Sequence, residues 1–325
     1  MSTTPPPSDS IAGALLGTAV GDALGMPVEG LSHANVRTYY KGIKEYRDDD
    51  QRGDLGAGQW TDDTQMTFAL VRSLTDHPAS PDAWPAAVAD EYVALRPEAR
   101  RWGETTTTAV DRLADGTPPA EAGVPDRPTD GAAMRAAPLG VWWAARDLDR
   151  EAAFEAIRPV LAVTHRHPAA LAAGWGQAVA VHTLLGWTPD AFDRAAFWER
   201  LVDATAWAEG RLDGDDRVSG RLEALADHLD AFPLNLGDAC DGVGIRADEA
   251  WPFACAMVAR RAHLLENTLL SGINVGGDAD TTGAMMGAML GALHGWSAFP
   301  DEWGEGLEAF DRLEAEARAL AGALS

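Results

Sequence analysis

Cysteine and basic residues are both scarce in this chain of 325 residues. The two cysteines, Cys240 and Cys255, are too few for a disulfide framework or a cysteine zinc site, which predicts a reduced, cytoplasmic protein. Only 26 lysines and arginines oppose 50 aspartates and glutamates, so the formal net charge is −24. That charge repels phosphate backbones and anionic membranes, and we expect neither as a partner. A hydrophobic content of 46% excludes wholesale disorder.

A targeting segment and a clear membrane span are also lacking. Residues 1–10 are polar and proline-rich, without the basic and apolar regions of a secretory signal, and we expect a short disordered lead-in. The longest uncharged apolar stretch, residues 281–300, has marginal length for a span. Its glycines and the acids before it favour a buried helix.

Helical periodicity dominates the rest of the chain. Apolar residues recur at helical spacing, as over residues 83–95, and alanine, the best helix former, is abundant. Alternating strand patterns are scarce, with residues 35–40 as a weak candidate. We therefore predict one all-α domain over residues 11–325, in which residues 116–130 form a surface loop. The predicted helices span residues 11–24, 67–74, 83–95, 132–146, 150–163, 169–185, 191–207, 217–229, 249–271 and 304–324.

Two segments carry glycine at every fourth position. A glycine inside a helix costs about 1 kcal/mol relative to alanine, so each row needs a compensating interaction. A glycine ridge lets another backbone approach closely, which predicts tightly packed central helices with each other as candidate partners. The alternative is a loose glycine-rich loop, which the intervening Ala, Leu, Met and Val residues disfavour. The rows are Gly13, Gly17, Gly21 and Gly25, and Gly283, Gly287, Gly291 and Gly295.

A threonine and two aspartates stand where a helix is expected to begin, at Thr61, Asp62 and Asp63. Capping and the helix macrodipole are sufficient reasons for such residues at a helix start. A second cluster repeats the design, with Asp278 and Asp280 after two glycines. An N-cap with an Asx turn is the simple explanation there as well. The double glycine favours unusual backbone geometry or the close approach of a ligand.

Together the two clusters supply four carboxylates and two threonine hydroxyls. These hard oxygen ligands suit Mg²⁺, Mn²⁺ or Ca²⁺ and not zinc or copper. Four aspartates can hold two divalent ions about 4 Å apart. Without metal, so many neighbouring carboxylates would raise one another's pKa. The spacing alone does not bring the two clusters together.

Other polar residues have two explanations each. Glu29, after a glycine- and proline-marked helix end, is a candidate general base, although a lone loop glutamate is usually solvated. Asp22, in an otherwise apolar segment, is either paired in the core or near the site. Arg100 and Arg101 can reach a phosphate, but a solvated face is favoured. The histidine pair His165 and His167 is expected to shape a cleft.

Several stretches of the chain resemble the motifs of the ADP-ribosylglycohydrolase family. That family includes the dinitrogenase reductase-activating glycohydrolases and the ADP-ribosyl-arginine and ADP-ribosyl-serine hydrolases. The most specific parts are the Trp-Thr-Asp-Asp-Thr and Gly-Gly-Asp-Ala-Asp-Thr-Thr signatures. The matching stretches are spread over nearly the whole chain, at residues 13–29, 58–66, 101–106, 130–140, 164–165 and 276–295.

The resemblance implies a compact orthogonal all-α helical bundle with two Mg²⁺ ions, or Mn²⁺, in a dinuclear metal cleft. Glu29, Asp62 and Asp63 are the candidate catalytic residues. Glu29 looks like the glutamate that bridges or gates the metal site in the serine-type hydrolases. The implied metal ligands are Thr61, Asp62, Asp63, Asp278, Asp280 and Thr281.

The resemblance also implies a site for ADP-ribose. Residues 131–139 resemble the family's loop near the ADP-ribose phosphates, and their backbone amides suit an anion. The family often has asparagine before the glycine of this loop, where this chain has Asp130. The candidate substrate-binding residues are Gly103, Gly131, Ala132, Met134, Arg135, His165, Gly276 and Gly277.

The implied reaction is hydrolysis of the glycosidic bond between ADP-ribose and an acceptor, either a protein side chain or a small molecule. Two metal ions would clamp ribose hydroxyls and lower the pKa of a bound water. One alternative is a catalytically inactive ADP-ribose-binding or crystallin-like structural protein, and another is a hydrolase of a free ADP-ribosyl metabolite. The intact set of four aspartates favours a working metal centre, and we expect a monomer.

Overall fold

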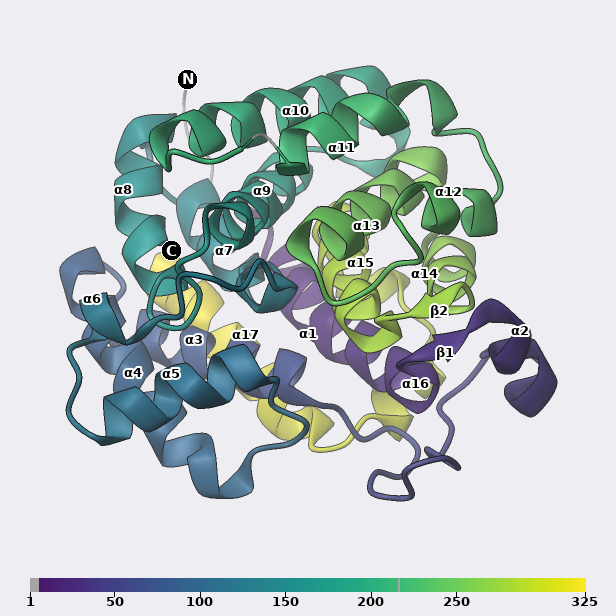
Figure 1. Ribbon diagram of the computed structural model, residues 1–325, viewed down its shortest axis with the longest axis horizontal. Helices are drawn as coiled ribbons and strands as arrows, with labels where there is room; N and C mark the ends of the chain where they lie inside the picture. Colours follow the sequence, from purple (N-terminus) through teal and green to yellow (C-terminus); the bar gives the residue numbers. More distant parts are fainter. Residues whose placement is uncertain (1–5, 216) are drawn as a thin grey trace.

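Two helices that lie far apart in the sequence run side by side through the middle of the molecule. They are α1 (Ser8–Gly25) and α15 (Ala279–His294). The computed structural model, which describes residues 6–215 and 217–325, surrounds this pair with further helices (Figure 1). Nearly all regular structure in the described residues is helical, which confirms the predicted all-α class.

The surrounding helices cover the central pair on several sides. Among them, α7 packs on α9, which is buried over almost its whole length, and α17 packs against α1 and α3. Besides the three-residue α2 (His33–Asn35) and the four-residue α6 (Pro119–Ala122), they are α3 (Asp62–Asp76), α4 (Trp84–Leu95), α5 (Glu104–Ala114), α7 (Ala137–Ala144), α8 (Arg150–Leu161), α9 (Pro168–Leu185), α10 (Arg194–Arg211), α11 (Arg217–Leu225), α12 (Pro233–Ala239), α13 (Ala247–Arg261), α14 (Leu265–Ile273), α16 (Asp301–Gly306) and α17 (Phe310–Leu324).

The two glycine rows face each other and form the contact between α1 and α15. A Cβ atom built on Gly17 would overlap the carbonyl oxygen of Gly287, and one built on Gly21 would overlap that of Gly283. Gly13 meets Gly291 in the same way. Backbone therefore packs directly on backbone, and the prediction of tightly packed central helices, with each other as partners, is confirmed.

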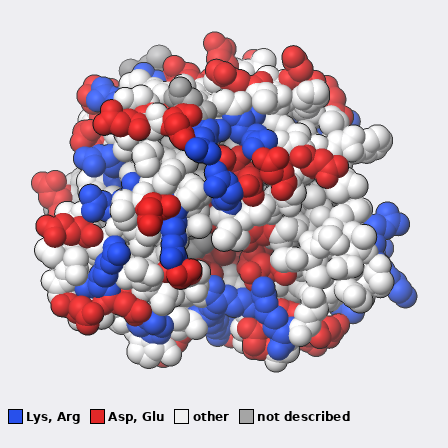
Figure 2. All heavy atoms as spheres, viewed as in Figure 1, with Lys and Arg blue, Asp and Glu red and all other residues white. Residues whose placement is uncertain are grey.

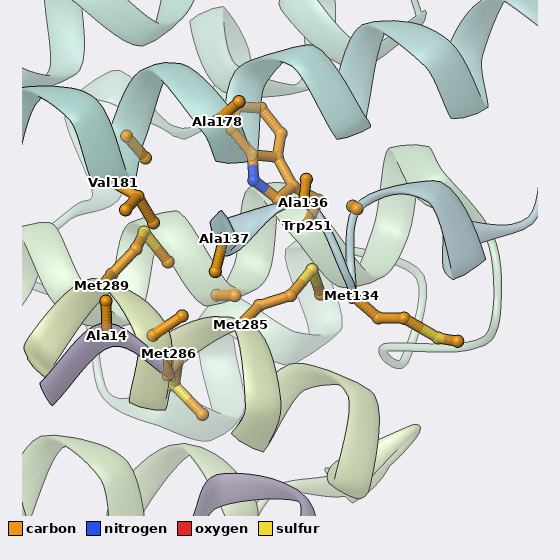
Figure 3. Packing of buried hydrophobic residues seen from close by; sticks show 14 of the residues in the cluster. Ala14, Met134, Ala136, Ala137, Ala178, Val181, Trp251, Met285, Met286 and Met289 are labelled. Carbon is orange, nitrogen blue, oxygen red and sulfur yellow. The ribbon is translucent and has the colours of Figure 1, made fainter. Parts of the chain in front are cut away.

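Side chains of the surrounding helices complete a continuous hydrophobic core. Three methionines of α15, Met285, Met286 and Met289, point away from the glycine ridge into this core (Figure 3). The Trp251 ring of α13 belongs to the same core and donates its indole N–H to Gln177 at 3.0 Å. Unbranched methionine side chains fill irregular gaps, which suits a helix that must contact one neighbour closely and others at ordinary distance.

The apolar character of the central pair follows from this burial. The segment Ser8–Val28 is long and apolar enough to cross a membrane, but 94% of its apolar 18-residue stretch is buried inside the protein. The stretch 281–300 is likewise a buried helix over most of its length, as the sequence predicted. A helix that is apolar all round is expected at the centre of a large core.

Several predicted boundaries are wrong. Residues 35–40 are a π-helical turn, Val36–Tyr40, because the Ser32 side chain accepts a hydrogen bond from the Asn35 N–H and starts helical winding. The sheet in the described residues consists of β1 (Leu31–Ser32) paired with β2 (Gly276–Gly277). Of the predicted lead-in 1–10, residues 1–5 lie outside the described residues, and α1 already begins at Ser8.

Breaks within predicted helices have local causes. The stretch 249–271 divides into α13 and α14, because the Thr268 hydroxyl donates to the Arg261 carbonyl at 2.8 Å and closes a turn there. The stretch 304–324 divides at Ala309, whose φ of 56° interrupts the helix before α17. The loop 116–130 contains α6 and ends on the buried Asp130, so its surface position is only partly correct.

The glycine contact predicts the stability of two matched variants. Gly17→Ala places a methyl group against the Gly287 backbone and should lower the free energy of unfolding by about 3 kcal/mol, despite the better helix propensity of alanine. Gly220→Ala on α11 is the control, because no described atom lies within 4 Å of a Cβ built there, and it should be neutral or stabilising. Urea unfolding measures both, and equal stabilities would contradict the packing argument.

Candidate metal and active site

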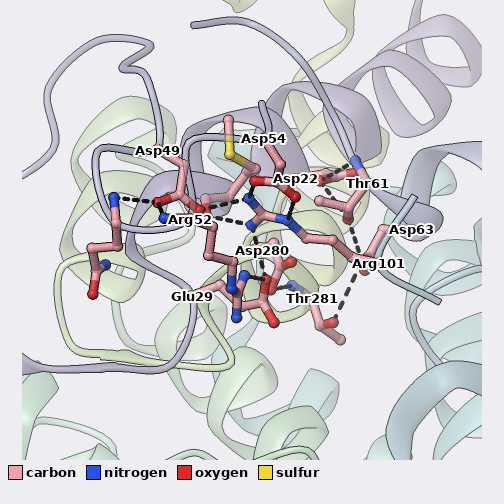
Figure 4. Close-up of polar contacts among 12 residues, drawn as sticks. Asp22, Glu29, Asp49, Arg52, Asp54, Thr61, Asp63, Arg101, Asp280 and Thr281 are labelled. Carbon is pink, nitrogen blue, oxygen red and sulfur yellow. Dashed lines mark hydrogen bonds and ion pairs between the residues drawn. The ribbon is translucent and has the colours of Figure 1, made fainter. Parts of the chain in front are cut away.

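Three buried aspartates from three helices converge at one end of the central pair. Asp22 comes from α1, Asp63 from the first turn of α3 and Asp280 from the first turn of α15 (Figure 4). One carboxylate oxygen from each lies within 4.8 Å of the other two. The two clusters that the sequence analysis separated are thus brought together, and Asp22 joins them.

Asp22 anchors the start of α3. Its carboxylate accepts hydrogen bonds from the N–H groups of Thr61 and Thr64, each at 3.0 Å, and from their hydroxyls at 2.9 and 2.6 Å. Burial raises the pKa of Asp22 to about 6, against the lowering effect of these hydrogen bonds. Both explanations offered for Asp22 therefore hold, because it is paired in the core and it lies in the site. The sequence analysis did not include it among the site residues.

Asp63 is the most enclosed of the predicted carboxylate ligands. Its Oδ2 atom accepts from the Thr61 hydroxyl at 3.1 Å and from the Thr281 hydroxyl at 3.5 Å. Its Oδ1 atom is buried without a hydrogen-bond partner in the described residues. Asp62, next to it, is only half-buried, so the predicted pair divides into an inner and an outer carboxylate.

The electrostatics of the cluster favour a bound cation. Burial first, and then neighbouring carboxylates, raise the pKa values of Asp62, Asp63, Asp278 and Asp280 well above the ordinary range. An unpartnered buried oxygen and mutual repulsion are both relieved by a divalent cation, which prefers such hard oxygen ligands. The residues present therefore fit a metal ion of the magnesium class.

Glu29 lies at the edge of the site, after the short 3₁₀ turn η1 (Met26–Val28). Its carboxylate forms ion pairs with Arg52 and with Arg101, the latter at 3.1 Å. Figure 4 shows both arginines beside it. Glu29 is thus not the solvated loop residue that was its alternative explanation.

The two arginines after α4 are not on a solvated face, and that expectation is wrong. The Arg101 side chain is only 10% exposed and pairs with Asp49 at 2.6 Å and with Asp54. The backbone of Arg101, with a φ of 55°, directs its side chain toward the loop that carries these two aspartates. Arg100 pairs with Glu308 and stacks on the Trp60 ring at 4.4 Å. Both arginines thus pair with acidic residues that are distant in the sequence and close only in the folded protein.

The predicted phosphate loop is buried and firmly held. Gly131 and Ala132 lie in η5 (Asp130–Ala132), and Met134 follows at 4% exposure. A Cβ on Gly131 would come within 2.6 Å of the His165 ring, so only glycine fits there. Burial lowers the pKa of His165 well below its usual range and keeps the ring neutral.

Arg135 supports this loop from within. It is completely buried and donates to the Thr164 hydroxyl at 2.6 Å, the Leu161 carbonyl at 3.2 Å and the Gly131 carbonyl. The Thr164 hydroxyl in turn contacts His165 Nδ1 at 2.8 Å. These bonds point into the protein, so in the described structure Arg135 orders the loop.

The double glycine adopts the unusual backbone that was predicted. Gly276 and Gly277 have φ values of 84° and 73°, and side chains there would overlap the carbonyl oxygens of Leu31 and Val243. Their pairing with β1 fixes the entry of the chain into α15. Gly103, by contrast, is exposed at the start of α5. A hollow near the centre of the face in Figure 2, bordered by both acidic and basic side chains, lies over the region of α1 and the neighbouring end of α15.

The all-α fold and the converging carboxylates define a helical protein with a candidate cation site. Comparisons with known proteins identify its family. The profile of the ADP-ribosylglycohydrolase family matches residues 3–325, so the chain belongs to this family, and the resemblance seen in its motifs is confirmed. A solved structure described as an ADP-ribosylglycohydrolase-related protein complex superposes with a TM-score of 0.76 at 26% identity, over 98% of this chain and 99% of that chain.

Relatives match over nearly their whole length, and two of them are named as hydrolases. ADP-ribosyl-[dinitrogen reductase] glycohydrolase of Rhodospirillum rubrum is 29% identical over 99% of this chain and 97% of its own. ADP-ribosylhydrolase ARH3 of Mus musculus is 27% identical over 95% of this chain and 90% of its own. An uncharacterized protein of Archaeoglobus fulgidus is 31% identical over 94% of each chain.

The raised pKa values predict a pH-dependent response to cations. A folded-state pKa above the unfolded value means that the folded protein holds extra protons, so its stability falls as pH rises through that interval. For Asp22 the interval runs from 3.8 to about 6, and the other aspartates extend it upward. A cation replaces those protons, so the rise in melting temperature caused by Mg²⁺ should grow with pH.

Thermal unfolding in chelator and in Mg²⁺, compared across this pH range, measures the effect. A stabilisation by Mg²⁺ that does not change with pH would contradict a cation held by these carboxylates.

Proposed function

We propose that this protein is a Mg²⁺-dependent hydrolase that cleaves the glycosidic bond between ADP-ribose and an acceptor, which reverses ADP-ribosylation. The observation that carries the proposal is the convergence of Asp22, Asp63 and Asp280, with an unpartnered buried oxygen on Asp63. The hydrolases among the relatives support the choice of reaction.

Two bound Mg²⁺ ions, or Mn²⁺, would supply Lewis-acid stabilisation and a binding point for ribose hydroxyls. The chain's own ligands for them would be Thr61, Asp62, Asp63, Asp278, Asp280 and Thr281. The hydrogen bonds from Thr61 and Thr281 to Asp63 orient the inner carboxylate before any ion binds. Asp22 acts through Thr61 and Thr64, because its hydrogen bonds hold the first turn of α3 in place.

The catalytic base would come from the outer carboxylates. Asp62 is half-buried, so it lies between the enclosed cluster and the solvent from which the attacking water arrives. Glu29, held by Arg52 and Arg101, would orient a substrate hydroxyl or the water. A carboxylate fixed by two guanidinium groups keeps its position at little entropic cost during the reaction.

The ADP-ribose moiety would lie along the loop around Gly131. The inward bonds of Arg135 order this loop, and the close packing of Gly131 on His165 determines its shape. Gly276 and Gly277 allow a close approach at the start of α15. The other proposed binding residues are Met134, Ala132 and Gly103.

We expect the protein to be a cytoplasmic monomer, with neither nucleic acid nor a membrane as a partner.

A hydrolase acting on a free ADP-ribosyl metabolite, and an inactive ADP-ribose-binding or structural protein, are the other candidates. The complete set of aspartates favours an active enzyme over the structural protein. The acceptor is then decided by comparing release of ADP-ribose from ADP-ribosylated arginine, ADP-ribosylated serine and small ADP-ribosyl compounds.

Asp278→Ala and Asp62→Ala test the proposal. Each should lower the rate of ADP-ribose release by roughly a thousandfold, since loss of metal-held stabilisation removes several kcal/mol. Both variants should remain folded by circular dichroism. Asp90→Ala, an exposed aspartate on α4, is the control and should keep the wild-type rate.

Calorimetry with ADP-ribose separates binding from turnover. The wild type should bind ADP-ribose only when Mg²⁺ is present, and Asp278→Ala should lose that binding. Full activity of the two site variants, or of the wild type in excess chelator, would overturn the two-metal proposal. Binding of ADP-ribose without turnover on any acceptor would favour the inactive alternative.

A further inference from the structure

A sixth aspartate lies against the cluster without belonging to the predicted ligands. Asp130, the first residue of η5, is 5% exposed, and its Oδ2 atom is buried without a hydrogen-bond partner in the described residues. Its carboxyl group lies within hydrogen-bonding range of the Asp278 carboxyl group. The sequence signal was present, because an acid stands here where the family often has asparagine.

One short segment aligns these two aspartates. The Val243 carbonyl accepts a hydrogen bond from the Asp278 N–H at 2.8 Å, and the Ile245 carbonyl accepts one from the Asp130 N–H at 3.1 Å. An isolated bridge pairs Thr129 with Arg246 beside them. Acceptors two residues apart on one turn segment thus hold the two carboxylates next to each other, from elements about 150 positions apart in the chain.

The surroundings of Asp130 are acidic. Burial first, and then the charges of Asp63 and Asp280, raise the pKa of Asp130 well above the ordinary range, against a lowering effect of its contact with Asp278. Arg135, which follows Asp130 in the same loop, donates to Leu161, Thr164 and Gly131 instead. A buried carboxylate with one unused oxygen and anionic neighbours needs either a proton or a cation.

We propose that Asp130 is a further carboxylate of the cation site, in which its unpartnered oxygen and Asp278 hold a divalent ion together. The inference rests on the proposed function, because it assumes that the aspartate cluster binds cations. It goes beyond that function in assigning a residue to the site. The competing explanation is a proton shared permanently between Asp130 and Asp278, which makes Asp130 structural only.

Asp130→Asn distinguishes these explanations, because the amide keeps the shape of the side chain and removes its charge. The probe is Mn²⁺ alone, titrated by calorimetry without ADP-ribose. Loss of a carboxylate from the site should weaken Mn²⁺ binding by about 10- to 100-fold. Asp126→Asn, which removes an exposed charge from the same loop, is the matched control and should bind as the wild type does.

The melting temperature in chelator is the second measurement. Asp130→Asn should melt at the same temperature as the wild type or higher, since it removes a repulsive buried charge. A lower melting temperature, or failure to fold, would assign Asp130 a structural role and overturn the inference. Unchanged Mn²⁺ affinity would overturn it as well, while leaving the proposed function intact. Absence of Mn²⁺ binding in the wild type would instead overturn the proposed metal centre itself, and the inference with it.

Discussion

The direct contact between the backbones of α1 and α15 is the constraint on which the rest of the structure depends. Glycines at every fourth position remove the side chains that would keep the two helices apart. Close approach of two helices gains dispersion along their whole length, which offsets the poor helix propensity of glycine. The other helices then pack around this pair with ordinary side chains, the methionines of α15 among them.

The same contact places the chemistry. Asp22 follows Gly21 in the sequence, and Gly21 contacts Gly283, which lies three residues after Asp280. The depth of the helix contact therefore determines the distance between Asp22 and Asp280. Asp63 joins them because Asp22 accepts the hydrogen bonds of the first turn of α3. The contact between α1 and α15 thus brings three carboxylates from three helices close enough to bind a single ion.

A cluster of this kind works against the stability of the protein that contains it. Buried carboxylates with raised pKa values and unpartnered oxygens lower the stability of the folded state near neutral pH. Such a cost is typical of a functional site, and the surrounding core is large enough to support it. Around the cluster, the guanidinium groups of Arg101 and Arg52 pair with the outer acids, and the inner acids are left for a cation.

The sequence by itself determined the all-α class, the glycine ridge and the two signatures that hold four of the aspartates. Composition, periodicity and local motifs carry this information, because helix formation and capping depend on neighbours in the chain. It did not determine the breaks at Arg261 and Ala309, which follow from local turns that compete with helical periodicity.

The tertiary structure alone decided which residues meet. Asp22 lies in the site because it accepts hydrogen bonds from residues about 40 positions away in the sequence. Asp130 lies against Asp278 because one segment accepts hydrogen bonds from both. Arg101 is buried, contrary to expectation, because distant acids pair with it. In each case the deciding energy is a long-range electrostatic or hydrogen-bonding interaction, and local sequence patterns carry no record of such partners.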